Sequence, residues 1–340
     1  MKNVIISALA SICIVLLSCT KDPQVTAGNT ISNSYVVSTL AGNGQEGYLD
    51  GPGNLAQFKS LINIVADPQG NVYVADAFNY VIRKISPSGV VSTLAGDGVY
   101  GFVNGSGSMA RFRYPTRITI DPQGNLYVVD NYRIRKITTD GLVTTFAGGE
   151  TMGSINGADT AARFYSISSI TSDRMGNVYV KESGLGNGGT LKIRKITPTG
   201  VVSTFSEDAI LSISLTTDNA NNIYSGGSYY DGSIYRYSPL GVKSTVKQME
   251  GFLTSLGRDE QGNFYYTEGG PFSFSYKHQL FKVSSSGEIS VIAGIEASGY
   301  ADGEGNISKF AYPTSLTIDA QGNIFVADVG NLRIRKITKK

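Results

Sequence analysis

Short runs of alternating hydrophobic and polar residues fill most of the chain, and turn residues separate them. The runs Ile118-Thr-Ile120 and Leu126-Tyr-Val128 flank a turn that reads Asp-Pro-Gln-Gly-Asn. Alternation with a period of two is typical of strands that bury one face, and Gly or Asn in the turn accepts a positive φ. In the preceding copy of this pattern, a third run, Ile82-Arg-Lys-Ile85, and a fourth, at residues 90–94, are joined by a second turn. The pattern predicts units of four antiparallel strands.

This four-strand unit recurs six times, about every 50 residues, which is the period of a propeller blade. The first turns of the six copies begin at Asp67, Asp121, Asp173, Asp218, Asp259 and Asp319. Ile or Leu stands three residues before every one of these Asp residues, and Tyr or Phe stands six residues after it. We therefore expect an all-β fold, a six-bladed β-propeller of four-stranded antiparallel blades over residues 35–340.

The two ends of the repeated region predict how the ring closes. The sixth copy stops after Ile337-Thr338 and lacks a fourth strand, while residues 36–42 nearly duplicate residues 90–96. The N-terminal strand should therefore serve as the outer strand of the last blade. Closing the ring in this way leaves no open sheet edge.

The repeated motif resembles that of NHL-repeat β-propellers. The matching elements are Asp-x-x-Gly-Asn followed by an apolar residue, Tyr-Val and Asp, then Asn79 or Asn331, and Ile-Arg-Lys-Ile. The resemblance covers residues 35–340 and is weak in the fourth repeat, where Asn221 replaces Gly and Ser225-Gly-Gly replaces Val-Ala-Asp. It implies no single activity, because such folds host lyases, lactonase-like hydrolases, RNA binders and interaction scaffolds.

The first 34 residues read as targeting sequence. A basic start precedes an apolar run at residues 4–17, which is too short to span a bilayer and favours a secretory signal peptide over residues 1–18. The run ends in Leu-Leu-Ser18-Cys19, which resembles the lipobox of bacterial lipoproteins, where the signal is cut before a Cys that is then lipidated. An ordinary buried Cys is the alternative. Residues 19–34 then form a flexible tether that carries the lipidated Cys19.

The net charge and the cysteine content limit the classes of partner and the cell compartment that we expect for this chain. The net charge of +2 excludes a strongly basic nucleic-acid binder, and we expect no nucleic-acid partner. Cys13 leaves with the signal, so an acylated Cys19 cannot form an internal disulfide. We expect a monomer anchored by its N-terminal lipid in the cell envelope of a Gram-negative-type bacterium, facing the periplasm or the surface.

Two kinds of residue could carry metal chemistry. Metal-dependent lyases of this fold use several His residues, whereas this chain has one, His278. Acidic residues end the second strands of five repeats and could converge on the central channel to bind Ca²⁺: Asp76, Asp130, Glu182, Glu268 and Asp328. The alternative is that they pair with arginines recurring on the third strands, Arg83, Arg135, Arg194 and Arg335. Equal recurrence of acid and base favours pairing, so we expect no catalytic residue, metal site or cofactor, with Ca²⁺ left open.

Four Gly-rich inserts, at residues 41–51, 95–105, 147–157 and 293–303, follow fourth strands. The segment 302–306, which begins at the end of the last insert, faintly resembles a Ca²⁺ loop, but no insert has the Lys-Ser/Thr and helix of a phosphate-binding loop. We expect the glycines to serve loop geometry, with Phe58, Phe112, Phe164 and Phe310 filling space between blades.

Departures from the repeat indicate a binding surface. No insert precedes the fourth or the fifth repeat, and the loops between second and third strands are enlarged in repeats three to five. Loops after second and fourth strands emerge at one end of the propeller, here called the long-loop face. Long aromatic loops on a rigid scaffold often bind ligands, although loop drift is an equal alternative. The candidate ligand-binding residues are Tyr229, Tyr230, Asp231, Phe272, Tyr276 and His278.

Two functions remain. The first is a lipid-anchored, exported binding or interaction module that takes a glycan or protein ligand on the long-loop face. The alternative is a lyase or lactonase-like hydrolase with a carboxylate-held divalent metal in the central channel. The single His and the absence of a legible Ser-His-Asp arrangement favour binding.

Overall fold

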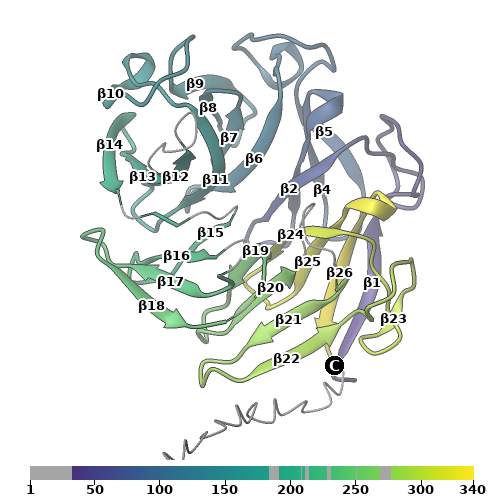
Figure 1. The fold of residues 1–340 in the computed structure, drawn as a ribbon. Helices are drawn as coiled ribbons and strands as arrows, with labels where there is room; N and C mark the ends of the chain where they lie inside the picture. Colours follow the sequence, from purple (N-terminus) through teal and green to yellow (C-terminus); the bar gives the residue numbers. More distant parts are fainter. Residues whose placement is uncertain are drawn as a thin grey trace, which may run out of the picture.

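Six antiparallel sheets stand around a common centre in the computed structural model (Figure 1). The structure describes residues 33–183, 191–207, 209–210, 214–227, 231–249, 251–268 and 277–340. The expected all-β, six-bladed propeller is confirmed. Within these residues no helix has the length and apolar character needed to cross a membrane.

Each blade contributes four strands that run from the centre outward. Blade 1 comprises β2 (Leu61–Ala66), β3 (Val72–Asp76), β4 (Val81–Ile85) and β5 (Val91–Ala95). Blade 2 comprises β6 (Pro115–Ile120), β7 (Leu126–Asp130), β8 (Arg133–Ile137) and β9 (Val143–Ala147). Blade 3 comprises β11 (Ser166–Ser172), β12 (Val178–Ser183), β13 (Leu191–Ile196) and β14 (Val201–Ser206).

The second half of the ring repeats this order. Blade 4 comprises β15 (Leu215–Thr217), β16 (Ile223–Gly226), β17 (Ile234–Tyr237) and β18 (Lys243–Lys247). Blade 5 comprises β19 (Leu253–Arg258), β20 (Phe264–Glu268), β21 (Leu280–Val283) and β22 (Ile289–Ala293). Blade 6 comprises β24 (Pro313–Ile318), β25 (Ile324–Asp328), β26 (Arg333–Lys339) and β1 (Tyr35–Ala41).

The N-terminal strand closes the ring, as the sequence predicts. In Figure 1 the purple β1 lies beside the yellow β26, and the two pair antiparallel from Tyr35–Lys339 to Ala41–Ile334. The expected position differs in one detail, because β1 is not the outermost strand of its sheet. The two-residue strand β23 (Gly303–Glu304), from the last Gly-rich insert, pairs with the outer side of β1.

The Gly-rich inserts leave the long-loop face and return along the outer edge of the next blade. The strand β10 (Gly157–Ala158) pairs with β14 in the way that β23 pairs with β1. Isolated bridges from Gly51 to Val91 and from Gly105 to Val143 repeat the arrangement on blades 1 and 2. The inserts therefore cover outer strands that would otherwise present unpaired backbone groups to other chains.

The hydrophobic core lies between neighbouring blades. Ile64 and Val74 of blade 1 pack with Phe325 and Ile334 of blade 6, and the pattern continues around the ring. Both faces of the second strands are therefore buried, which explains why these strands read as nearly continuous apolar runs.

The recurring Asp and Tyr form one turn motif. In blade 1, Asp67 Oδ1 accepts hydrogen bonds from the backbone N–H groups of Gln69 and Asn71, and Oδ2 accepts from the Asn71 amide and the Tyr73 hydroxyl. The spacing of six residues between Asp and Tyr follows from this contact. Burial, with Asp67 nearby, raises the pKa of Tyr73 to about 12.

Candidate functional site

The acidic ends of the second strands are paired with arginines, which confirms the structural alternative for four of the five. The ion pairs are Arg83–Asp76 at 3.2 Å, Arg135–Asp130 at 3.1 Å, Arg194–Glu182 at 2.5 Å and Arg335–Asp328 at 2.7 Å. Both side chains of each pair are buried. Glu268 lies 3.3 Å from Lys277 instead.

Each of the four carboxylates paired with an arginine also accepts at least one backbone hydrogen bond. Oδ1 of Asp130 accepts the N–H groups of Arg113 and Tyr114, both at 2.8 Å. Burial raises the pKa of Asp76, Asp130 and Asp328, and the hydrogen bonds and the arginines offset only part of that effect. The carboxylates hold the first strand, the second strand and the insert together.

The Gly-rich inserts supply the remaining partners of the arginines. Arg83 donates to the carbonyl oxygens of Leu49 and Gln57 and to the carboxylate of Asp50. Its guanidinium carbon lies 5.1 Å from the centre of the Phe58 ring. Arg135, Arg194 and Arg335 have equivalent partners in Asn104, Asn156 and Asp302 and in the rings of Phe112, Phe164 and Phe310. These Phe residues fill space between neighbouring blades, as expected.

The segment that resembles a Ca²⁺ loop uses its acids in ion pairs. Asp302 contacts Arg335 at 2.6 Å, and Glu304 contacts Lys340 at 2.5 Å. In the described part of the chain no three His, Cys, Asp or Glu side chains come together closely enough to hold a metal ion.

The predicted ligand-binding residues fall in two groups. Tyr229, Tyr230, Phe272 and Tyr276 lie outside the described residues, as do Cys19 and the signal segment. Asp231 accepts hydrogen bonds from the backbone N–H of Ser233 and the hydroxyl of Tyr235. Burial acts to raise the pKa of Asp231, but these hydrogen bonds outweigh it and hold the pKa below its usual value.

His278 is buried just before β21. Its φ of 48° is left-handed, as at Tyr80 and Leu332, which occupy the same position before the third strands of blades 1 and 6. Nδ1 accepts the backbone N–H of Tyr312 at 3.2 Å, and the ring meets that of Tyr312 edge-on. Burial lowers the pKa of His278, which favours the neutral imidazole.

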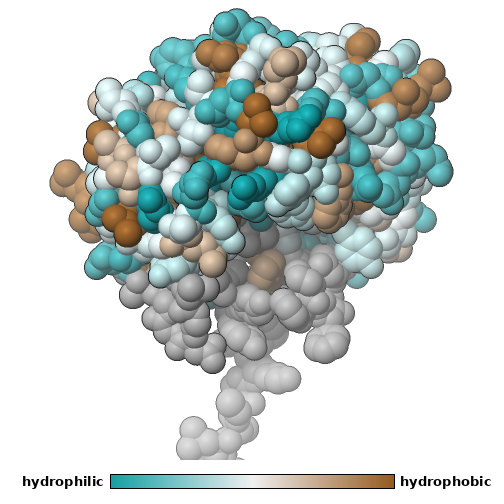
Figure 2. All heavy atoms as spheres, turned by 90° about the horizontal axis from the view of Figure 1, so that it is seen from above, coloured by the Kyte–Doolittle hydropathy of each residue, from teal (hydrophilic) through white to brown (hydrophobic). Residues whose placement is uncertain are grey.

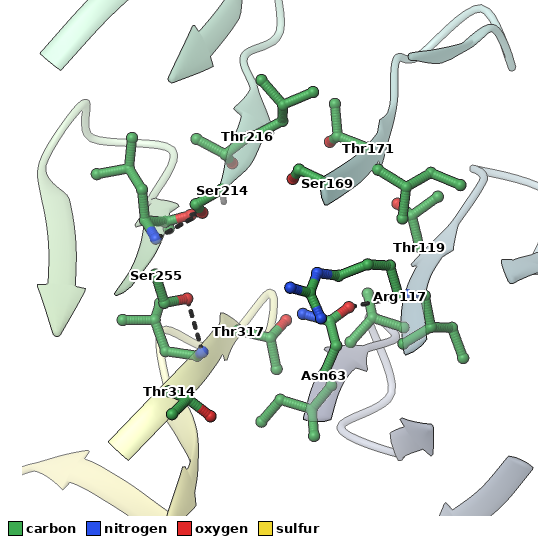
Figure 3. A pocket seen from close by; sticks show the side chains of 18 of the residues that line it. Asn63, Arg117, Thr119, Ser169, Thr171, Ser214, Thr216, Ser255, Thr314 and Thr317 are labelled. Atoms are coloured by element: carbon green, nitrogen blue, oxygen red, sulfur yellow. Dashed lines mark hydrogen bonds between the residues drawn. The ribbon is translucent and has the colours of Figure 1, made fainter. Parts of the chain in front are cut away.

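A cavity of about 420 Å³ occupies the central channel and is lined by first strands from all six blades. Hydroxyl groups dominate the polar part of its wall in Figure 3, among them those of Thr119, Ser169, Thr171 and Thr317. The charged side chains in the lining are Arg117 on β6 and Arg258 on β19. In Figure 3 the Arg117 side chain extends from its strand into the cavity. Sequence reasoning missed this cavity, because it compared the motif positions of the repeats rather than the channel positions.

The opposite end of the channel has a different lining. A second cavity of about 330 Å³ is bounded by the turns that begin at Asp67, Asp121, Asp173, Asp218 and Asp319. These carboxylates are occupied by their own turns, as at Asp67.

Exposed apolar side chains are dispersed over the outer surface. Figure 2 shows brown apolar residues singly or in small groups among teal polar ones on the described atoms of one face. Several of the exposed apolar residues lie in the inserts, such as Leu49 and Val103, or in the segments just after them, such as Met109 and Ile307. They mark the rim of the propeller rather than one continuous patch.

Comparisons with known proteins agree with the fold. The family model of the teneurin NHL domain matches residues 103–338. The chain is 24% identical over 311 residues to Protein SUPPRESSOR OF QUENCHING 1, chloroplastic, from Arabidopsis thaliana, covering 88% of this chain and 27% of that protein. It is 26% identical over 380 residues to Teneurin-3 from Mus musculus, covering 89% of this chain and 13% of that protein. The chain thus spans about an eighth to about a quarter of the length of these relatives.

Solved structures with this fold include proteins from bacteria. A protein of unknown function from Bacteroides thetaiotaomicron has a TM-score of 0.68 at 18% identity, covering 90% of this chain and 76% of that one. An auxiliary nutrient binding protein from the same organism has a TM-score of 0.64 at 15% identity, covering 89% and 76%. A gluconolactonase from Xanthomonas campestris has a TM-score of 0.57 at 13% identity, covering 89% of each chain. At these identities the likeness shows the fold alone.

Proposed function

The chain belongs to the teneurin NHL domain family, and from that premise we propose that its propeller is a binding module that takes a glycan or a protein ligand on the long-loop face. The observation that carries the proposal is the use of the recurring acids. Asp76, Asp130, Glu182 and Asp328 are each committed to a buried arginine, so their recurrence reflects the packing of the inserts rather than a reaction centre.

The absence of inserts before blades 4 and 5 supports a binding surface near these two blades. Inserts and buried arginines occur together on blades 1, 2, 3 and 6, whereas Tyr235 and Phe281 occupy the arginine position on blades 4 and 5. In the sequence, the segments between the second and third strands are longer in repeats three to five than in the other repeats. The proposal assigns ligand contact to residues of these segments: Tyr229, Tyr230, Asp231, Phe272, Tyr276 and His278.

Export and anchoring complete the proposal. Cleavage before Cys19 and lipidation of that residue tether a monomeric propeller to a membrane of the cell envelope, through residues 19–34. The apolar run at residues 4–17 and the Leu-Leu-Ser-Cys sequence support this localisation. The solved nutrient-binding propeller from Bacteroides shows that this fold occurs in a protein described as a binding protein.

A screen of glycans and purified extracellular proteins against the mature chain tests the binding function. Tyr230→Ala and Phe272→Ala should weaken binding of the ligand found in the screen, because a ring stacked on a ligand contributes about 0.5–1.5 kcal/mol beyond its burial. Both variants should keep the urea midpoint of the parent. Met175→Ala, an exposed change in a turn at the opposite end, is the matched control. Normal binding by both aromatic variants would remove this face from consideration.

The alternative is a lyase or lactonase-like hydrolase with a carboxylate-held divalent metal in the channel. The gluconolactonase with the same fold favours keeping this candidate. Within the described residues, Glu268 contacts Lys277 rather than an arginine, unlike the other four recurring acids, and it is the carboxylate we would test first. Stoichiometric metal in purified protein, lost in Glu268→Gln, would favour the enzyme over the binding module.

A further inference from the structure

The first strands present two rings of aligned side chains at the channel. In the first ring, five blades carry Ser or Asn and one blade carries Arg117. That ring consists of Asn63, Arg117, Ser169, Ser214, Ser255 and Ser315, each directly before the recurring Ile or Leu. In five blades the residue follows an irregularity in the pairing of first and second strands, as between Pro115 and Arg117. Such bulges re-aim side chains. Arg117 is the charged member of a ring that is otherwise Ser or Asn.

The small residues of this ring connect neighbouring blades. Asn63 accepts the N–H of Ile118 at 2.8 Å, Ser255 accepts that of Leu316 at 2.9 Å, and Ser214 and Ser315 make equivalent bonds. Arg117 makes the link to blade 3 by donating Nε–H to the carbonyl of Ser168 at 2.8 Å. Nη1 donates to the carbonyl of Thr116 at 3.1 Å. A guanidinium has five N–H donors, so three remain for the cavity.

Among the described residues, no carboxylate balances the positive charge of Arg117. None of their ion pairs involves Arg117, and no Asp or Glu lines the cavity. Burial lowers the pKa of Arg117 to about 10, so the group is charged at neutral pH. The buried arginines between strands and inserts, by contrast, each have an acid within 3.2 Å. A partly buried charge without a protein partner favours an anion from solution.

The second ring lies two residues further along each strand and carries hydroxyl groups in four of the six blades. It contains Thr119, Thr171, Thr216 and Thr317, with Val65 and Gly257 at the two remaining positions. Figure 3 places these threonines around the same space as the Arg117 side chain. The volume of about 420 Å³ suits a molecule the size of a sugar. Hydroxyl donors and acceptors on the wall match hydroxyl groups on such a ligand.

We propose that the central channel is a binding site for a small hydroxylated carboxylate, with Arg117 as the partner of the carboxylate and the threonine ring as the partner of the hydroxyl groups. The forked guanidinium suits a carboxylate in two-point contact, which a lysine would not provide. This site goes beyond the proposed function, because it requires neither the aromatic loops of the long-loop face nor the lipid anchor.

Matched pairs of sugars isolate the carboxylate. Glucuronate and galacturonate should bind the mature chain in calorimetry and raise its unfolding temperature, while glucose and galactose should do neither. Arg117→Ser places in blade 2 the residue that four other blades carry, so the fold already accommodates it. This variant should weaken glucuronate binding about tenfold or more. Arg236→Ser removes one positive charge from an exposed site on β17 and should leave binding unchanged.

Other outcomes would overturn the proposal. Equal binding of glucose and glucuronate, or unchanged glucuronate affinity in Arg117→Ser, would exclude Arg117 as the anion partner. Inorganic phosphate that binds as tightly as glucuronate would exclude the hydroxyl contribution. If Arg117→Ser does not fold, phenylglyoxal modification of the unaltered protein provides the test. Glucuronate should slow the modification of Arg117, measured by peptide mass, and leave Arg236 unaffected, whereas equal rates at Arg117 with and without glucuronate would refute the site.

Discussion

Removing the charge of Asp130 tests whether the recurring acid–arginine pairs hold the blades together. Asn in place of Asp130 still offers one oxygen to the N–H groups of Arg113 and Tyr114. Its amide N–H₂ group would face Nη1 of Arg135, however, so two donors would meet where the ion pair now stands at 3.1 Å. Arg135 would keep a buried charge without its counter-ion. Breaking a buried pair from one side costs about 3–5 kcal/mol.

That loss is a large share of the roughly 5–15 kcal/mol by which a domain is stable. We therefore expect Asp130→Asn to lower the urea midpoint strongly at an unchanged slope. In a double-mutant cycle with Arg135→Met, the two substitutions together should cost less than the sum of the singles, by about 1–3 kcal/mol. The second change removes the charge that the first one leaves unpaired.

An exposed pair in the neighbouring insert provides the control. Asp97 lies 2.7 Å from Arg111, a shorter distance than that of the buried pair, but the two side chains are 24% and 43% exposed. Asp97→Asn should therefore cost less than about 1 kcal/mol. If Asp130→Asn unfolds at the same urea concentration as Asp97→Asn, the buried pairs do not stabilise the blades and the reasoning is wrong.

Three further predictions follow from the closure, from one buried lysine and from the N-terminus. A chain that begins at residue 42 should lose several kcal/mol in urea unfolding relative to one that begins at residue 33, because it lacks the buried Val37 and the β1–β26 ladder; equal midpoints would contradict closure by β1. Burial lowers the pKa of Lys181 to about 7, below the ordinary 10.5, so the folded state binds fewer protons than the unfolded chain between these values and gains stability as pH rises through that window. Lys181→Met should therefore be more stable than the parent at pH 7, and urea unfolding should show the difference shrinking toward pH 10; a difference independent of pH would refute the shift. Mass spectrometry of the mature protein should find a lipidated Cys19 at its N-terminus, and Cys19→Ser should release the protein from the membrane; an unmodified Cys19 would contradict anchoring.

The architecture could be predicted because one short motif carries several physical requirements at once. Asp67 closes a turn with Asn71 and binds the Tyr73 hydroxyl, so the Asp and the Asn recur at one spacing in all six copies and the Tyr in five, with Phe325 in the sixth. The closure was equally accessible, since residues 36–42 repeat the fourth strand that the last copy lacks. The outer fifth strands were not, because β10 and β23 pair through backbone groups of two residues each and leave no side-chain pattern.

The role of the inserts was only partly visible in the sequence. Asp50, Asn104, Asn156 and Asp302 occupy equivalent positions in the four inserts, and in the sequence they look like an imperfect series of Ca²⁺ ligands. In the structure both Asp and Asn serve, because each needs only one side-chain oxygen to accept a hydrogen bond from an arginine. The sequence holds a signal for this role. The arginine on the third strand and the insert before its blade are present together in four blades and absent together in the other two.

The same comparison explains why the channel was missed and why it carries chemistry. The residues that the repeats share form the turns and the packing between blades. A ligand, by contrast, meets positions that packing leaves free to vary, and in a propeller these are the channel-facing residues of the first strands. At the position before the recurring Ile or Leu, four blades have Ser and one has Asn, each small enough to bond the next blade. Packing alone gives no reason for Arg117 in the sixth, since Ser or Asn at this position links neighbouring blades elsewhere in the ring without placing a charge in the channel.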